Sequence, residues 1–555
     1  MCKNDSLVAV VFARIEYIVK REWINMSMQL SQSALQRRMS RKFQVALVLE
    51  GSAVGLVAGG IVTCYRLCLS TAEKTLRQTS QFIVDNPIYL PLFILGMAII
   101  MLTIGKLMLW EPYTAGSGIP QIDAEVAGKV DMPWHKVLVA KFSEGILCTL
   151  GGLSLGREGP SVQLGGMGGK AVSRALHKGR AEERILVTCG AGAGMAAAFH
   201  APLTGVMFAL EEIHKVFTAP LIISVTISSV VADYLVCQVL GVAPVLSLQF
   251  AEDLPHNMYL LVILMGITLG ILGAMHNKGM FAVQDLYKKL DKKLPYSRLL
   301  IAFIISGFAV FYAPDLICGG DAIVEIMDGV SPVGLKMLFF LLLGKYILTT
   351  ISFGSGAPGG TLFPLVVMGS LCGAIFGEIA VGTVGMDSTF ITNFMVLGIA
   401  GLFAGVIRAP VTGIVLAFEL TGTLDSMLSA ALVAIIAYVT ANVCEVEPFY
   451  EKLYFDFLGR TSTEPMCDME GEKILHTHIV EAGSFIEGKK IKDITWPDSM
   501  LVVTVKRAGN DMIANGDTLL EAADKVLVIM NLDEEDSCER EIRAMCRGVI
   551  GSPGR

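Results

Sequence analysis

The sequence predicts an all-α, multi-pass membrane domain of two related halves with broken helices, followed by a small α+β cytoplasmic domain. Three observations lead to this fold class: an apolar composition, an internal repeat, and a change of composition near residue 460. Only 17% of the 555 residues are charged, against roughly 25% in soluble proteins. Hydrophobic residues make up 53% of the chain and 57 residues are glycine, a usage typical of closely packed membrane helices.

Charge and cysteine patterns argue against several other classes. Residues 461–555 hold 18 acidic and 11 basic residues, so they carry the whole net charge of −7, and no strongly basic face for nucleic acid is present. The 12 cysteines form no C-x-x-C pair, which argues against a zinc site or a disulfide framework. We therefore expect no cofactor and no bound metal. The apolar run at residues 7–13 lacks the cleavage site of a signal peptide, so we expect no signal peptide there.

The composition divides the chain into four predicted segments. Basic clusters, one of them at Lys178, Arg180 and Arg184, indicate loops that face the cytoplasm. The segments are a cytoplasmic N-terminal stretch (1–42), a membrane domain (43–455), a linker (456–470) and a cytoplasmic C-terminal domain (471–555). We expect a multi-pass protein of a prokaryotic cell membrane with both termini in the cytoplasm.

An internal repeat relates the two halves of the membrane domain, about 43–245 and 255–455. Residues 201–211 (APLTGVMFALE) match residues 409–419 (APVTGIVLAFE) at six of eleven positions, with an offset of 208. A second match with an offset of 204 pairs the glycines and proline of one segment with those of another: Gly156, Pro160 and Gly165 with Gly360, Pro364 and Gly369. The residues alone do not decide whether the halves are parallel or inverted.

Three glycine-rich turns share one design: GSGIP (116–120), GREGP (156–160) and GGTLFP (359–364). Each ends in a proline that we expect to open an apolar helix, since proline suits the first helical position. A helix start inside a membrane presents unpaired N–H groups and the positive end of the helix dipole, which attract an anion. The alternative is that each turn is merely a break between packed helices.

Acidic residues near these turns are candidates for proton transfer. Glu158 lies within GREGP at expected membrane depth, where an ionisable residue is costly and is by default a functional candidate. Its carboxylate could occupy an anion site when charged and leave when protonated, whereas a salt bridge to Arg157 is the alternative. The repeat places Leu362 at the matching position, so the fold does not need an acid there.

The repeat also separates two neighbouring glutamates. Glu211 matches Glu419 and is expected to be structural, whereas Glu212 matches Leu420 and suggests a proton path, unless it merely faces cytoplasmic water. With His214 these residues form Glu-x-x-His, a motif that can ligate a di-metal site, but the repeat lacks the second histidine. We therefore do not expect a metal there.

Two hydroxyl residues and the tail complete the candidates. Ser117 in the first turn and Tyr450 after Pro448 offer hydroxyl donors to an anion, although each could simply be a packing residue. In the tail, residues 501–507 and 525–530 are expected to be strands, separated by Gly509 and Gly516. His476 and His478 are expected to be solvated rather than to bind a metal.

Over about residues 43–455 the sequence resembles the CLC family of chloride channels and chloride/proton antiporters. The resemblance rests on an ordered set of motifs: GSGIP, GREGP, AGAGMAAAFHAPLTGVMFALEE, GSGAPGG with TLFP, and the late PFY. The resemblance implies inverted halves and a homodimer with one anion pathway per subunit. By position, Glu158 corresponds to the gating glutamate and proton acceptor, and Glu212 to the internal proton-transfer residue of exchangers. It also implies an anion-binding set: Gly116, Ser117, Arg157, Glu158, Gly159, Thr361, Leu362 and Tyr450.

The sequence departs from the family at two places. The family commonly has phenylalanine at the position of Leu362, whereas the aromatic residue here is Phe363, which makes the shape of the outer gate less certain. The tail lacks paired CBS modules, and residues 483–530 instead resemble the C-terminal regulatory domain of RCK (TrkA-type) potassium proteins. That resemblance implies a domain that senses an unidentified small ligand or forms a dimer.

The expected activity is exchange of chloride for protons, with chloride, protons and membrane lipid as partners. The nearest alternative is a passive chloride channel of the same fold, which Glu158 alone would permit and Glu212 argues against. Nitrate or fluoride selectivity is a further alternative, although nitrate-preferring relatives tend to carry proline at the position of Ser117. A membrane enzyme is disfavoured because no H-E-x-x-H or G-x-S-x-G motif is present.

Overall fold

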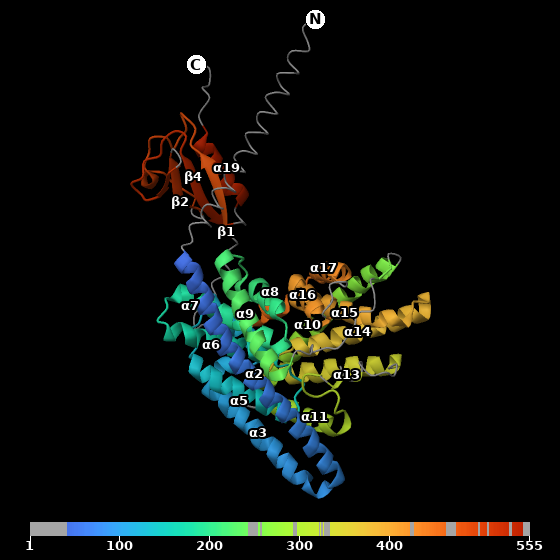
Figure 1. Ribbon diagram of the computed structural model, residues 1–555. Coiled ribbons are helices and arrows are strands. Elements are labelled where there is room, and N and C mark those ends of the chain that lie inside the picture. The colour runs from blue at the N-terminus through green and yellow to red at the C-terminus, as the bar shows by residue number, and fades with distance from the viewer. Residues whose placement is uncertain are drawn as a thin grey trace. The chain divides into compact units, whose positions relative to one another are not determined.

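Two compact units make up the chain, Met1–Leu458 and Gly459–Arg555, and each is described by itself (Figure 1). The structure is a computed structural model that describes residues 41–241, 254–255, 258–291, 297–320, 322–323, 326, 334–421, 427–461, 473–497, 500–507, 510–531 and 535–547. The predicted N-terminal segment 1–42 lies almost entirely outside these residues, as do Gly509 and part of the predicted linker 456–470.

Helices and connecting turns make up the described residues of the first half of the membrane unit. Its elements are α2 (Arg41–Asp85), η1 (Pro87–Tyr89), α3 (Leu90–Trp110), η2 (Pro112–Thr114), α4 (Ile119–Val126), α5 (Trp134–Leu150), α6 (Glu158–Ala175), α7 (Arg180–Phe199), α8 (Pro202–Phe208), the π-helical turn η3 (Ala209–His214) and α9 (Ala219–Leu240). Several helices, among them α4 and α8, are far too short to span a bilayer, which requires about 20 residues.

The second half repeats this order. Its elements are α10 (Tyr259–Asp291), α11 (Ser297–Tyr312), α13 (Leu335–Gly354), α14 (Leu362–Val384), η5 (Ser388–Phe390), α15 (Ile391–Ile407), α16 (Pro410–Thr421), α17 (Met427–Val443) and α18 (Phe449–Thr461). Within the described residues, seven helices are long and apolar enough to cross a membrane. The predicted helical membrane domain is therefore confirmed.

Glycine contacts hold equivalent helix pairs together in both halves. In the first half α6 packs against α7, and in the second α14 packs against α15. A Cβ atom on Gly165 would collide with the backbone of Gly190 and Gly194, and one on Gly398 would collide with the backbone of Gly369. Because Gly165 and Gly194 precede Gly369 and Gly398 by 204 residues, the repeat preserves the same close helix approach.

Reciprocal carboxylate caps join the two halves. Glu211, just after α8, accepts hydrogen bonds from the backbone N–H groups of Val411 (3.2 Å) and Thr412 (2.7 Å) at the start of α16. Glu419, near the end of α16, accepts from the N–H groups of Leu203 (2.7 Å) and Thr204 (2.6 Å) at the start of α8. The equivalent helices α8 and α16 thus run antiparallel, which is the arrangement of inverted repeats.

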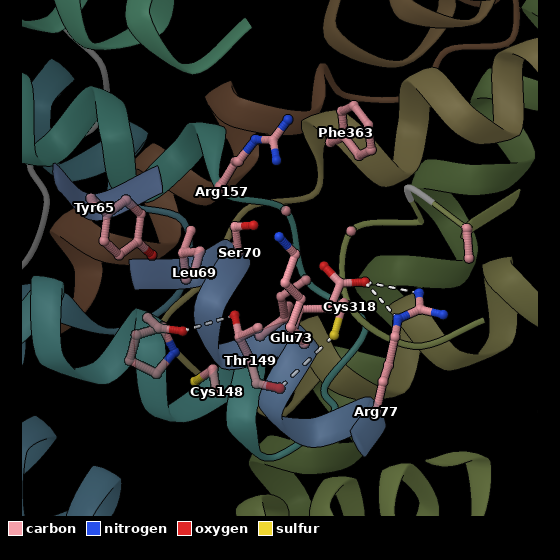
Figure 2. Close-up of a pocket in the computed structure, with 18 residues that line it drawn as sticks. Tyr65, Leu69, Ser70, Glu73, Arg77, Cys148, Thr149, Arg157, Cys318 and Phe363 are labelled. Carbon is pink, nitrogen blue, oxygen red and sulfur yellow. Dashed lines mark hydrogen bonds and ion pairs between the residues drawn. The ribbon is translucent and has the colours of Figure 1, made fainter. Parts of the chain in front are cut away.

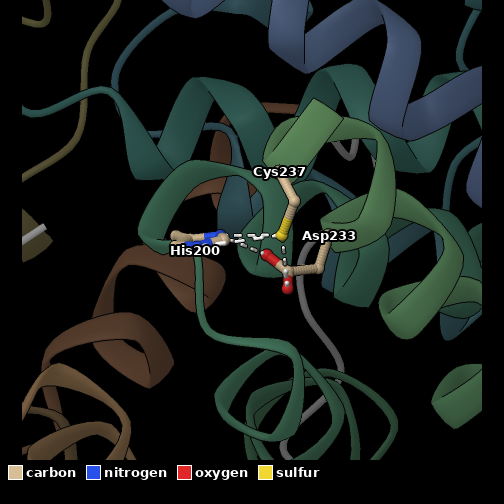
Figure 3. Close-up of side chains that lie close together, drawn as sticks. All are labelled: His200, Asp233 and Cys237. Atoms are coloured by element: carbon tan, nitrogen blue, oxygen red, sulfur yellow. Dashed lines mark hydrogen bonds and ion pairs between the residues drawn. The ribbon is translucent and has the colours of Figure 1, made fainter. Parts of the chain in front are cut away.

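A polar contact joins the end of α7 to α9 (Figure 3), and an equivalent contact joins the end of α15 to α17. His200 ends α7 with a positive φ of 56°, and its Nδ1 lies 2.7 Å from Oδ1 of Asp233 on α9. Arg408 ends α15 with a φ of 73°, and its Nε donates to Asn442 on α17 at 2.8 Å. Cys237 adds a sulfur 3.9 Å from the His200 ring nitrogens.

Proline does not open the three helices in the way the sequence predicts. Pro120 is the second residue of α4, whereas Pro160 and Pro364 are the third residues of α6 and α14. The prediction of a first-position proline is therefore wrong by one or two residues. Proline is tolerated there because the first four N–H groups of a helix have no intrahelical partner.

The second unit contains a four-stranded antiparallel sheet with the strand order β1-β4-β2-β3. Its elements are β1 (Lys473–Ile479), η6 (Ile491–Asp493), β2 (Met500–Arg507), β3 (Asn510–Ile513), β4 (Lys525–Asn531) and α19 (Glu535–Cys546). Helix α19 packs on β1 and β4, and the core between them contains Val505, Val528 and Ile542. The predicted strands 501–507 and 525–530 and the α+β class are confirmed.

One expectation about this unit is wrong. The side chain of His478 is only 8% exposed, so it is not solvated, and that of His476 is 25% exposed. Both residues lie on the same face of β1 because alternate residues of a strand point to the same side. Glu539 of α19 lies 3.1 Å from His478 and 3.5 Å from His476.

Removing one reciprocal cap is expected to destabilise the membrane unit. Glu419→Gln keeps the shape of the side chain but removes the negative charge of the carboxylate. That carboxylate accepts hydrogen bonds from two backbone N–H groups and from the Thr204 hydroxyl. Hydrogen bonds to charged groups contribute about 1.5–3 kcal/mol each, so the melting temperature in detergent should fall clearly. Exposed Glu445→Gln is the control, and equal melting temperatures of the two variants would contradict the assigned role.

Candidate functional site

The three glycine-rich turns meet at one place and are bonded to one another. Gly156 and Gly360, which the repeat pairs, each donate a backbone N–H to the carbonyl of the other, at 2.7 and 2.8 Å. Gly116 donates to Gly356 at 3.1 Å and accepts from Gly359 at 3.0 Å. The starts of α4, α6 and α14 therefore converge on one buried point, to which both halves contribute.

Glu158 is fully buried at the first position of α6. Its Oε2 accepts a hydrogen bond of 3.2 Å from the backbone N–H of Phe363, in the first turn of α14. A carboxylate on a helix N-terminus occupies a position that attracts anions. Nε of Arg157 also lies 3.8 Å from Oε1, so the ion pair named as the alternative is present but is longer than the contact with the backbone donor.

The shifted aromatic residue lies directly at this position. Both Leu362 and Phe363 are buried, and the guanidinium carbon of Arg157 lies 5.2 Å from the centre of the Phe363 ring. Phe199 of α7 packs against the same ring, with 6.3 Å between centroids. The aromatic side chain is thus fixed between Arg157 and α7, while the backbone N–H of Phe363 remains directed at Glu158.

Three hydroxyl groups gather beside the same turns. The Ser117 oxygen accepts from the Ile119 N–H at 3.4 Å, so its own proton is directed elsewhere. Tyr450, at the start of α18, is completely buried. Its hydroxyl lies close to Ser117 and Thr361 but makes no hydrogen bond of regular geometry within the described residues. A buried hydroxyl without a partner is costly, and a bound anion would satisfy it.

The structure brings the predicted set together from four helix starts. Gly116 and Ser117 precede α4, and Tyr450 lies at the start of α18. The remaining predicted anion ligands lie at the starts of α6 and α14: Arg157, Glu158, Gly159, Thr361 and Leu362. A Cβ atom on Gly159 would lie 2.7 Å from the Ser117 hydroxyl, which shows how closely the turns approach.

Two buried lysines that sequence reasoning missed hold the loops in place. Lys141 of α5 donates to the carbonyls of Thr114 (2.8 Å) and Gly116 (2.6 Å). Lys345 of α13, which follows 204 residues later, donates to two carbonyls of its own half, those of Leu316 and Cys318. A lysine within an apolar helix, repeated at the established offset, is the sequence signal that would have identified both.

A cavity of about 410 Å³ adjoins the turns and was also missed (Figure 2). Gly156, Arg157 and Phe363, which flank or contact Glu158, are among the residues that line it. The α2 residues Glu73, Lys74 and Arg77 line it as well, and Arg77 pairs with Glu73 at 2.9 Å. Cations outnumber acids among the lining residues, so the cavity favours entry of an anion.

Glu211 and Glu212 have different surroundings although they are neighbours. Glu211 caps α16, whereas Glu212 is 6% exposed within η3 and near Asp123 of α4. Asp123 is buried, and its Oδ1 has no hydrogen-bond partner within the described residues, so it forms a second acid that sequence reasoning missed. His214 lies 3.0 Å from the Thr188 hydroxyl, whereas Glu211 contacts α16. The two residues of the Glu-x-x-His motif therefore contact different parts of the structure.

Comparisons with known proteins agree with this geometry. Residues 96–442 match the family described as voltage gated chloride channel, and residues 475–543 match the TrkA-C domain. The H(+)/Cl(-) exchange transporter ClcA of Vibrio cholerae is 31% identical over 409 residues, which cover 72% of this chain and 87% of that protein. ClcA of Vibrio vulnificus is 30% identical over 419 residues, covering 74% and 89%.

Solved structures share the fold. A slow cyanobacterial Cl⁻/H⁺ antiporter superimposes with a TM-score of 0.69 at 28% identity, covering 75% of this chain and 98% of that one. A CLC-type fluoride/proton antiporter superimposes with a TM-score of 0.60 at 20% identity, covering 74% and 98%, which supports the fold alone. The family match covers more than half of the sequence and includes the turns that carry Ser117 and Glu158. The chain is a multi-pass membrane protein and belongs to the voltage-gated chloride channel family.

Proposed function

We propose that this protein exchanges chloride for protons across the membrane. The observation that carries the proposal is the carboxylate of Glu158, which accepts the backbone N–H of Phe363 at the start of α14. When it is charged, this carboxylate competes with an anion for the helix N-terminus. When it is protonated, it loses the electrostatic attraction to the helix N-terminus and can leave. One side chain then couples the two ions, because each proton that binds makes the position available to chloride.

Chloride binds, in this proposal, just inside Glu158. The Ser117 and Tyr450 hydroxyls and the backbone N–H groups of Thr361 and Leu362 surround it, and the amides of Gly116 and Ser117 face an inner position. Dipoles rather than a lysine make the contacts, so binding is weak enough for release. Lys141 acts indirectly, because it holds the carbonyl of Gly116.

Proton exchange on the other side of the pathway is assigned to Glu212. It is buried near Asp123, and the matching residue in the second half is Leu420, so the fold itself does not require this acid. A passive channel of the same family would not need such a group, which favours exchange over simple conduction. The relatives named H(+)/Cl(-) exchange transporter support the same choice.

Assembly and regulation complete the proposal. The protein forms a homodimer with one pathway per subunit, in the manner implied by the family. Both termini face the cytoplasm, because the loop with Lys178 and Arg180 is basic. The TrkA-C-like unit regulates transport through a bound ligand and contributes no residue to the pathway.

Glu158→Ala is expected to leave anion flux intact and to abolish coupled proton movement, because the side chain that alternates with chloride is gone. Chloride efflux and external pH are measured together in proteoliposomes. Glu445→Gln, on an exposed residue, is the matched control and should pump normally. Chloride-driven proton uptake that persists in Glu158→Ala would overturn the assignment.

Glu212→Gln should preserve chloride flux but abolish proton pumping. Its neighbour provides the control: Glu211→Gln should lower the melting temperature, because Glu211 caps α16, and leave the remaining folded protein coupled. The same flux and pH recordings distinguish the two. If Glu211→Gln uncouples a fully stable protein while Glu212→Gln does not, the wrong carboxylate has been chosen.

Ser117→Pro should raise the flux of nitrate relative to chloride, since proline removes both the hydroxyl and one backbone N–H. Ser117→Ala, which removes the hydroxyl alone, should give a smaller change. Competition between the two anions in proteoliposome efflux measures the ratio. Identical ratios in all three proteins would show that Ser117 does not contact the anion.

A further inference from the structure

A cluster of metal-ligand types lies in the TrkA-C-like unit, remote in sequence from the anion turns. His476 and His478 project from one face of β1, with ring centroids 6.2 Å apart, and Glu539 projects from α19. One ligand atom of each residue lies within 4.8 Å of the others. We propose that His476, His478 and Glu539 bind one transition-metal dication, for which Zn²⁺ is the best fit.

The spacing of the ligand atoms fits a tetrahedral ion. Zn²⁺ binds histidine nitrogen and carboxylate oxygen at about 2.1 Å, so tetrahedral ligands lie about 3.4 Å from one another. Oε2 of Glu539 lies 3.1 Å from Nε2 of His478 and 3.5 Å from Nδ1 of His476. The two separations bracket the value that the metal requires.

Two of the three ligand atoms have no partner outside the cluster. Nε2 of His478 and Oε2 of Glu539 are buried, lie 3.1 Å apart, and form no regular hydrogen bond with any other group among the described residues. Buried polar atoms with no partner outside such a cluster are rare, and a bound cation satisfies both at once.

The other carboxylate oxygen is already held. Nε of Arg543, one turn further along α19, donates to Oε1 of Glu539 at 2.6 Å and leaves Oε2 directed at the histidines. Such outer contacts orient metal ligands and tune their affinity. Two imidazoles and a carboxylate suit Zn²⁺ or a similar transition metal, whereas Mg²⁺ and Ca²⁺ prefer an all-oxygen set.

Coordination would join the first strand of the unit to its last helix. Residues 473–479 of β1 follow the connection from the membrane unit, and α19 lies at the far end of the described chain. A metal therefore fixes the packing of α19 on β1, which gives the regulatory unit two states that differ by one bound ion. An effect of that ion on transport rests on the proposed function, whereas the binding itself does not.

The test uses full-length protein in detergent, stripped with a chelator and titrated with Zn²⁺ by calorimetry. We expect one site per chain that Mg²⁺ does not compete for, and a loss of affinity of at least about tenfold in Glu539→Gln and His478→Gln. Exposed Glu541→Gln on the same helix should bind like the parent. His200, Asp233 and Cys237 also offer ligand types, so the difference between variants decides the site.

A second measurement covers the case in which the variants do not fold. In the parent protein, Zn²⁺ should protect His476 and His478 from diethyl pyrocarbonate, with His135 as the unprotected reference. Equal zinc affinity in Glu541→Gln, Glu539→Gln and His478→Gln, or no protection of either histidine, would overturn the proposal and leave a shared proton as the link between His478 and Glu539. Zinc binding without any change in flux would refute only the regulatory effect.

Discussion

Helices that begin against the opposite half of the protein impose the constraint on which this structure depends. The first N–H groups of such a helix have no partner within it and need acceptors from elsewhere. The chain provides carboxylates from the opposite half: Glu211 for α16, Glu419 for α8, and Glu158 for α14. The halves therefore cannot separate without exposing charged acceptors and unpaired donors, which makes the interface between them part of the fold.

The repeat distinguishes Glu158 from the other two capping carboxylates. Glu211 and Glu419 are equivalent, so the caps of α8 and α16 are symmetric. Glu158 has Leu362 as its equivalent, so α6 receives no carboxylate in return for the one that it supplies to α14. The helix starts around Glu158 are thus capped asymmetrically, and an anion can supply what the missing carboxylate does not.

Sequence reasoning predicted the helical membrane fold, the repeat, and the turns around Glu158, because glycine, proline and isolated acids are strong local signals in an apolar background. It missed Lys141, Asp123 and the cavity lined by Lys74. These residues lie within helices, and what they contact depends on how distant segments pack. The proline position failed for a local reason, since several positions of a first turn tolerate the missing N–H equally well. In the tail, His-x-His was visible, but its third partner is Glu539, 61 residues after His478 on another element.

Neighbouring residues with different surroundings show where the two halves diverged. Glu211 and Glu212 are adjacent, yet successive side chains of a helical turn point in different directions, so one reaches α16 while the other stays near α4. The π-helical turn at Ala209–His214 adds a residue to that turn, and such bulges are frequent at functional sites. What the halves share, Glu211 with Glu419 and Lys141 with Lys345, holds the architecture. What they do not share, Glu158 and Glu212, is the part of the sequence that stability alone does not explain.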